Sequence, residues 1–287
     1  MRGDRLSVFQ TLRTAWRVLR VRPFIFLGAL LLFVPSLPFI AFGIAALWIG
    51  VLEIRLTLDR VPELAWLVAP LLAASVVLVP TILTTLLTVP FHFVWHRLTL
   101  RTLAVVAAAG NPLLLCARFV GQFICFGILA SGVAAPALVL FLSVDMSLPV
   151  TLTVAAVTAC LALYLVARLS LVLPAAAIGQ SFGWRGAWRG TRANGVAIAV
   201  LIGLAMLPLA AIDAALVLPT VACDAGFGCA VVGWLYYALA LGGALSLFAL
   251  HLIAYFLSSA ILSGVLAASY KSLVLDRAAT AMAAPTS

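Results

Sequence analysis

Long apolar runs alternate with short polar and basic segments along the chain. Six of these runs reach the roughly 20 residues that a transmembrane helix requires. We place the spans near residues 24–48, 64–95, 113–144, 148–173, 195–222 and 231–268. The second and the last are longer than one crossing needs, so we expect those helices to tilt, kink or project from the membrane. The pattern predicts an all-α integral membrane protein with six transmembrane helices.

Two of the basic segments between the runs carry the same motif. Residues 13–20 (RTAWRVLR) match residues 185–192 (RGAWRGTR) at five of eight positions. Arginines at i, i+4 and i+7 share one helical face, and a neighbouring tryptophan is typical of a helix at the lipid–water boundary. A weaker third copy, with Arg97 and Arg101, precedes the third span. We therefore expect two or three interfacial amphipathic helices at the cytoplasmic surface.

The spacing of the copies indicates a threefold repeat of one surface helix plus one transmembrane hairpin. The breaks before the three spans, at Pro23, Pro112 and Gly195, are 89 and 83 residues apart. Such regular spacing is typical of internal duplication. Basic, tryptophan-containing flanks that recur without duplication are the alternative interpretation.

The composition agrees with a membrane protein. Hydrophobic residues make up 66% of the chain and charged residues 9%, against about 25% charged in a soluble domain. The mean hydropathy is +1.27. The net charge of +9 resides in short segments beside apolar runs, which is the topological signal of membrane proteins rather than a nucleic-acid footprint. We expect no nucleic-acid partner.

The charge asymmetry predicts the orientation. Basic residues crowd the segments on the side of the N-terminus, whereas the opposite connections contain only Arg55 and Arg60 and collect the acids. Cytoplasmic loops carry the excess of lysine and arginine. We therefore predict a single polytopic domain in a bacterial inner membrane, with both termini cytoplasmic. It comprises an amphipathic segment over 1–22, a six-span bundle over 23–270 and a tail over 271–287.

Signatures of catalysis are missing from the sequence. Every connection between the spans is short, and the chain has neither a phosphate-binding P-loop nor a Gly-x-Ser-x-Gly elbow. We predict no catalytic residue and no cofactor. Arg118 and Arg168 lie near the cytoplasmic ends of their spans, where long basic side chains reach the interface, so we expect structural roles for both.

A few polar residues inside the spans are candidates for a transport path. Asp213 interrupts the fifth span, Thr81 and Thr85 belong to a hydroxyl stripe in the second, and His251 lies in the sixth. Ionisable residues within a membrane mark substrate or proton pathways in many transporters. A helix-end carboxylate that reaches the outer interface is the alternative for Asp213.

The histidines are candidate metal ligands, and two of the cysteines are candidates for a disulfide. His92 and His96 are four residues apart, and His251 could join them, but no Glu or Cys pair accompanies them, so we predict no metal site. Cys223 and Cys229 flank a short, glycine-containing outer connection. In an oxidising periplasm such a pair favours a disulfide, with two free thiols as the alternative.

Two short stretches carry a resemblance to a known group. Residues 168–177 (RLSLVLPAAA) and 186–194 (GAWRGTRAN) are similar to uncharacterised bacterial multi-pass membrane proteins related to the membrane domain of glycerophosphodiester phosphodiesterases. Residues 15–23 and 268–273 fit the same pattern. The resemblance implies a polytopic membrane fold with both termini inside. It carries no catalytic residue to this chain, which lacks the polar phosphodiesterase domain.

These observations lead to one functional expectation and one alternative. We expect a non-catalytic membrane protein that engages anionic phospholipids or a membrane partner through its interfacial helices; a protein partner or a homo-oligomer is compatible with this. The alternative is a transporter or permease of a small or lipid-like solute. The expected headgroup- or partner-binding residues are Arg13, Arg17, Arg20, Arg185, Arg189 and Arg192.

Overall fold

The computed structural model describes residues 6–24, 26–28, 88–105, 111–143, 148–224 and 244–283. Within these ranges the chain forms helices and turns and contains no strand, which confirms the all-α prediction. The helices are α1 (Val8–Val21), α5 (Pro112–Ser143), α6 (Leu148–Leu169), α7 (Val172–Ala177), α8 (Trp184–Gly190), α9 (Gly195–Asp224), α11 (Ala244–Tyr270), the π-helix η3 (Lys271–Leu275) and α12 (Asp276–Ala283). Residues 88–102 are also helical.

Four helices in the described ranges are long and apolar enough to cross a membrane. They contain the apolar stretches Pro112–Leu129, Thr153–Ala177, Gly195–Ile212 and Ile253–Ala279, and they correspond to the last four predicted spans. The first predicted span, 24–48, and most of the second, 64–95, lie outside the described residues. These two spans stay predictions.

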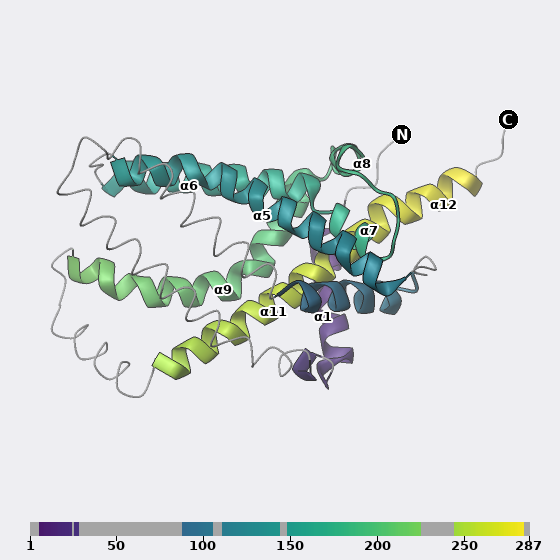
Figure 1. Ribbon diagram of the computed structural model, residues 1–287, viewed down its shortest axis with the longest axis horizontal. Helices are drawn as coiled ribbons and strands as arrows, with labels where there is room; N and C mark the ends of the chain where they lie inside the picture. The colour runs from purple at the N-terminus through teal and green to yellow at the C-terminus, as the bar shows by residue number, and fades with distance from the viewer. Residues whose placement is uncertain are drawn as a thin grey trace.

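The four long helices run alongside one another, and the short helices gather at one end (Figure 1). α5 packs on α6, α6 on α9, and α9 on α11. At the end where α11 continues through η3 into α12 lie α1, α8 and α7 (Figure 1). The surface helices and the chain's basic segments therefore share one end of the bundle.

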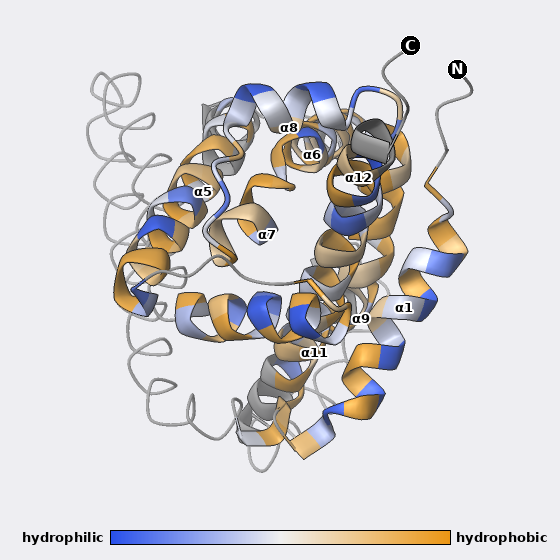
Figure 2. Ribbon diagram, turned by 90° about the vertical axis from the view of Figure 1, so that its right-hand side faces the viewer, coloured by the Kyte–Doolittle hydropathy of each residue, from blue (hydrophilic) through white to orange (hydrophobic). Residues whose placement is uncertain are grey.

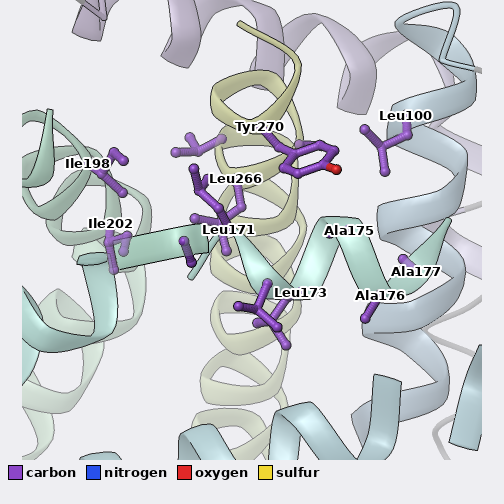
Figure 3. Close-up of a cluster of buried hydrophobic side chains, with 14 of the residues drawn as sticks. Leu100, Leu171, Leu173, Ala175, Ala176, Ala177, Ile198, Ile202, Leu266 and Tyr270 are labelled. Carbon is purple, nitrogen blue, oxygen red and sulfur yellow. The ribbon is translucent and has the colours of Figure 1, made fainter. Parts of the chain in front are cut away.

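A short helix, α7, lies in the middle of this end. Figure 2, which looks onto it, shows α7 surrounded by α5, α6, α8, α11 and the helical segment 88–102. Residues 171–178 are all buried, and all but Pro174 belong to the main hydrophobic cluster with Phe119. Figure 3 shows Leu100 and Tyr270 beside α7 in this cluster. An apolar segment thus fills the ring of helices.

The predicted fourth span, 148–173, was too long at its end, because α6 stops at Leu169 and α7 is a separate helix. Pro174 explains the break. A proline has no N–H to donate and its ring collides with the carbonyl four residues earlier, which here belongs to Ser170. The Ser170 carbonyl instead accepts a hydrogen bond from the backbone N–H of Leu173 over 3.1 Å. α7 ends before Gly179, whose φ of 80° favours glycine.

The first surface helix, α1, crosses α11 at a point of close approach. A Cβ built on Gly264 would lie only 2.8 Å from Cβ of Ala15, so glycine allows the two helices to meet there. Ala15 is itself 2% exposed. Small residues at a crossing let helix backbones approach closely in membranes, and this contact seats α1 on the bundle.

The last predicted span, 231–268, also ends later than expected. α11 continues to Tyr270, and η3 and α12 extend the helical path to Ala283. The tail predicted from residue 271 therefore begins as a helix.

Candidate functional site

The first arginine segment occupies α1, and its side chains divide between two faces. The N-cap residue Ser7 accepts a hydrogen bond from the backbone N–H of Gln10, a usual way to start a helix. Thr11, Ala15 and Val18 are buried. On the opposite side Trp16 is 41% exposed. The three predicted arginines of this copy, Arg13, Arg17 and Arg20, are exposed as well. The face that the motif predicts is thus turned outward.

The second segment forms α8 and repeats this division. Ala187, the counterpart of Ala15, is completely buried, and Trp188 is 42% exposed, close to the value of Trp16. The predicted arginines of this copy are also exposed, namely Arg185, Arg189 and Arg192. We call the six arginines and two tryptophans of the two copies the arginine surface.

A buried cation holds α8 on α6. The guanidinium of Arg168, 4% exposed, donates to the carbonyl oxygens of Trp188 at 2.7 Å and Thr191 at 3.2 Å. It also lies 4.3 Å from the Trp188 ring centroid. Cations stabilise the carbonyl-rich C-terminal end of a helix, and charge-assisted hydrogen bonds are the stronger kind. Arg168 thus has the structural role that its position near the end of the span predicted, and its side chain is enclosed beneath α8.

The hydroxyl of Thr191 completes this contact from the other side. Its Oγ1 donates to the carbonyl oxygen of Arg168 or of Ala187, with O···O separations of 2.9 and 2.8 Å. The start of α9 also depends on a close approach, since a Cβ on Gly195 would lie 2.7 Å from Cδ of Arg168. The turn between α8 and α9 is therefore fixed against the end of α6.

A buried hydrogen bond connects the chain segments that flank the two copies. The backbone N–H of Leu6, just before α1, donates to Oδ1 of Asn194, just after α8, over 2.9 Å in a buried setting. This bond joins residues 188 positions apart. It brings the chain just before α1 to the turn between α8 and α9.

The helical segment 88–102, which holds the weaker third copy, is anchored differently. Its Trp95 is 1% exposed and donates through Nε1 to the carbonyl oxygen of Ala260, 3.0 Å away in α11. Lys271 donates to the carbonyl oxygen of Leu103, also over 3.0 Å. Arg101 is exposed. The tryptophan beside this copy is thus buried in the core, unlike Trp16 and Trp188.

The histidines of this segment lie in aromatic surroundings. His92 packs against Phe123 and His96 against Phe119, with ring centroids 4.8 and 5.6 Å apart. Burial, and to a smaller extent His92, lowers the pKa of His96 to about 3, so this imidazole is neutral at pH 7. Among the described residues no three His, Cys, Asp or Glu side chains come together in a metal-binding arrangement. His251 therefore does not join His92 and His96.

The remaining predicted positions are only partly covered. Asp213 and Cys223 fall within α9 and His251 within α11. Thr81, Thr85 and Cys229 lie outside the described residues. The transport path and the disulfide stay predictions.

A cavity that the sequence did not indicate opens beside α7. Its volume is about 210 Å³. Its walls come from α5, α7 and the loop that leads to α8: Arg118, Gln122, Val172, Ala176, Gln180, Ser181, Phe182 and Gly183. The sequence feature that could have pointed to this cavity is the spacing of Arg118 and Gln122, which are four residues apart and therefore share a helix face.

No family model matches the chain, and neither a curated protein nor a solved structure matches it.

Proposed function

We propose that this protein is a non-catalytic, multi-pass membrane protein that engages anionic phospholipid headgroups through the arginine surface. One observation carries the proposal: both copies of the motif turn their alanine inward and expose their tryptophan to almost the same degree, 41% for Trp16 and 42% for Trp188. Sequence identity alone does not require two helices in different surroundings to expose the same side chains.

The chemistry of the exposed side chains fits a membrane surface. Each Lys or Arg near an anionic leaflet contributes about 1 kcal/mol of attraction, which falls off within a Debye length. Tryptophan prefers the headgroup region because its ring is apolar and its N–H is polar. An arginine also presents several N–H donors to one phosphate. Arginines and tryptophans exposed on two helices at the same end of the bundle therefore suit phosphate headgroups.

The proposal includes a topology. We propose six transmembrane helices in a bacterial inner membrane, both termini cytoplasmic, and a threefold repeat of surface helix plus hairpin. The positive-inside charge bias supports the orientation, and the shared burial pattern of Ala15 and Ala187 supports duplication of the copies at 13–20 and 185–192. A relation to the membrane domain of glycerophosphodiester phosphodiesterases belongs to the proposal as well, without the phosphodiesterase activity.

The test is mass spectrometry of the lipids that remain with the purified full chain, compared with those of the source membrane. Wild-type protein should be enriched in an anionic phospholipid. Changing Arg185, Arg189 and Arg192 together to Gln should reduce this enrichment by about fivefold for each arginine that contacts a headgroup. The same positions changed to Lys keep the charge and serve as the matched control, which should retain most of the enrichment.

A lipid profile equal to that of the source membrane in the wild-type protein would contradict the proposal. So would equal enrichment in the Gln and Lys variants. In either case attention would move to the alternative, a transporter or permease of a small or lipid-like solute, for which an Asp213→Asn variant in an uptake assay is the first test.

A further inference from the structure

The cavity beside α7 combines polar and apolar walls. Val172, Ala176 and Phe182 supply the apolar part, and Arg118, Gln122, Gln180 and Ser181 the polar part. No carboxylate lines it, so Arg118 leaves the cavity with a net positive charge. At about 210 Å³ it is smaller than the roughly 300–1,000 Å³ of pockets for drug-sized ligands and suits a small polar group.

Two amides in its wall have hydrogen-bonding capacity that the protein does not use there. Oε1 of Gln122 is buried and has no hydrogen-bond partner, although buried polar atoms in native proteins are nearly always paired. Oε1 of Gln180 accepts from the Tyr270 hydroxyl, and the two N–H donors of that amide take no part in this bond. An unpaired amide beside a cation can therefore bind a polar, negatively charged ligand.

Arg118 lies on the outward stripe of α5. Leu114, Arg118, Gly121, Cys125 and Ile128 are all exposed, and their spacing of four, three, four and three residues places them on one helix face. Leu114 is 70% and Ile128 49% exposed. An apolar stripe of this kind on a membrane-crossing helix is suited to lipid acyl chains, and Arg118 interrupts it beside the cavity.

The depth of Arg118 matches that of a headgroup. It follows the first residue of α5, Pro112, by six positions, which is about 9 Å along a helix axis at 1.5 Å per residue. A basic side chain at that distance from a helix end reaches the polar boundary of the bilayer. A phosphate in the cavity would thus lie where lipid phosphates lie, with the stripe on α5 continuing toward the hydrocarbon.

We propose that this cavity is a binding site for a phosphate-bearing anion, held by Arg118 with the amides of Gln122 and Gln180, and that an anionic phospholipid headgroup supplies it. The phosphate pairs with the guanidinium, and hydroxyl groups of the headgroup donate to Oε1 of Gln122. The site is distinct from the arginine surface and does not rest on the function proposed for it. It accommodates one headgroup, whereas the arginine surface meets the leaflet as a whole.

The test is binding of short-chain lipids to the full chain in a neutral detergent, followed by native mass spectrometry. The probes are dioctanoyl phosphatidylglycerol, dioctanoyl phosphatidylcholine and inorganic phosphate. Wild-type protein should bind phosphatidylglycerol more tightly than phosphatidylcholine. Arg118→Gln should weaken phosphatidylglycerol binding by about fivefold, the effect of one charge on an anionic lipid. Gln122→Leu should weaken it less.

The matched control is Arg101→Gln, which removes another exposed charge at a residue that does not line the cavity. It should change binding by less than about twofold. Arg118 is exposed, so its variant should fold, and a gel-filtration profile like that of the wild type checks this. Arg118→Lys should recover part of the binding because the charge returns.

Three outcomes separate the possibilities. If inorganic phosphate competes with phosphatidylglycerol at the same concentration, the phosphate site stands and its source is a soluble ion; if it does not compete, the source is the lipid. If Arg118→Gln binds phosphatidylglycerol as tightly as Arg101→Gln, the proposal is overturned. The six arginines of the arginine surface are intact in every variant, so this failure would leave the function proposed above untouched.

Discussion

The two arginine segments place the same outward residues on differently built supports. α1 is 14 residues long and packs on α11 through the apolar contact of Ala15 with Gly264. α8 has 7 residues and is held through the polar contacts of Arg168. The arginines, alanine and tryptophan of the motif are identical in both copies, whereas the other positions differ. Their outward faces agree while their inner contacts differ.

The positions that differ explain the two supports. Val18 and Leu19 of the first copy correspond to Gly190 and Thr191 of the second. Val18 is 2% exposed and adds apolar burial to α1. Thr191 is completely buried and hydrogen-bonds to the backbone at the end of α6. The exposed residues of the motif are thus shared, and the residues that face the bundle follow their neighbours.

The largest expected effect comes from removing the support of α8 alone. Arg168→Ala deletes two charge-assisted hydrogen bonds at about 1.5–3 kcal/mol each, so the loss of stability should be about 3 kcal/mol or more. Thermal unfolding should show the loss, and hydrogen exchange should rise in α8 more than in α1. Arg118→Ala, which removes an exposed arginine, is the control. Equal exchange in both helices would mean that Arg168 does not hold α8 specifically.

The next largest effect is expected from a substitution that displaces α1 and leaves α8 in place. Gly264→Ala places a Cβ 2.8 Å from Cβ of Ala15 and 3.0 Å from its Cα, and overpacking of this kind costs about 1–3 kcal/mol. Exchange should rise in α1 and not in α8. The control is Gly203→Ala in α9, where the nearest atom to the new Cβ is 3.8 Å away. A Gly264→Ala protein as stable as the Gly203→Ala protein would contradict the importance of this crossing.

A smaller effect should follow from separating the two copies. Asn194→Ala removes the acceptor for the buried N–H of Leu6, at a cost of about 1–2 kcal/mol. Hydrogen exchange at the start of α1 should increase. Asn111→Ala is matched in position, because Asn111 also precedes a long helix, but its Oδ1 accepts from Leu113 within its own segment. If both variants loosen α1 alike, the bond between Leu6 and Asn194 is not what joins the copies.

The smallest difference is expected between the two tryptophans. They are almost equally exposed, but only the Trp188 ring covers the Arg168 guanidinium, at 4.3 Å. A cation–π contact contributes about 0.5–2 kcal/mol. Trp188→Ala should therefore lower the melting temperature more than Trp16→Ala. A reversed order in the melting curves would show that this contact does not stabilise α8.

Much of the fold could be predicted from the apolar pattern. The predicted third and fifth spans, 113–144 and 195–222, end within two residues of α5 and α9, because glycine, proline and charge mark their limits. The basic segments were also correctly assigned to separate helices, α1 and α8. α7 was missed, since a buried helix and the end of a span have the same apolar composition. Only the helices that surround Val172–Ala177 show that this segment is a buried helix and not the end of a span.

The candidate sites were predictable only in part. The outward arginines follow from the period of the helix. The burial of Arg168 does not, because its partners Trp188 and Thr191 are 20 and 23 residues further along the chain. The cavity likewise joins Arg118 of α5 to a loop some sixty residues later. A single sequence shows which residues share a helix face but not which helices meet.

The position of α7 has a consequence for permeation. Its six residues occupy the centre of the helix ring at the basic end of the bundle, so they act as a seal there. A solute that moved through the ring would first have to expel them. Exposing Val172 and Leu173 to water would alone cost about 3–6 kcal/mol. A path through this end of the described helices would therefore open only if this energy were supplied.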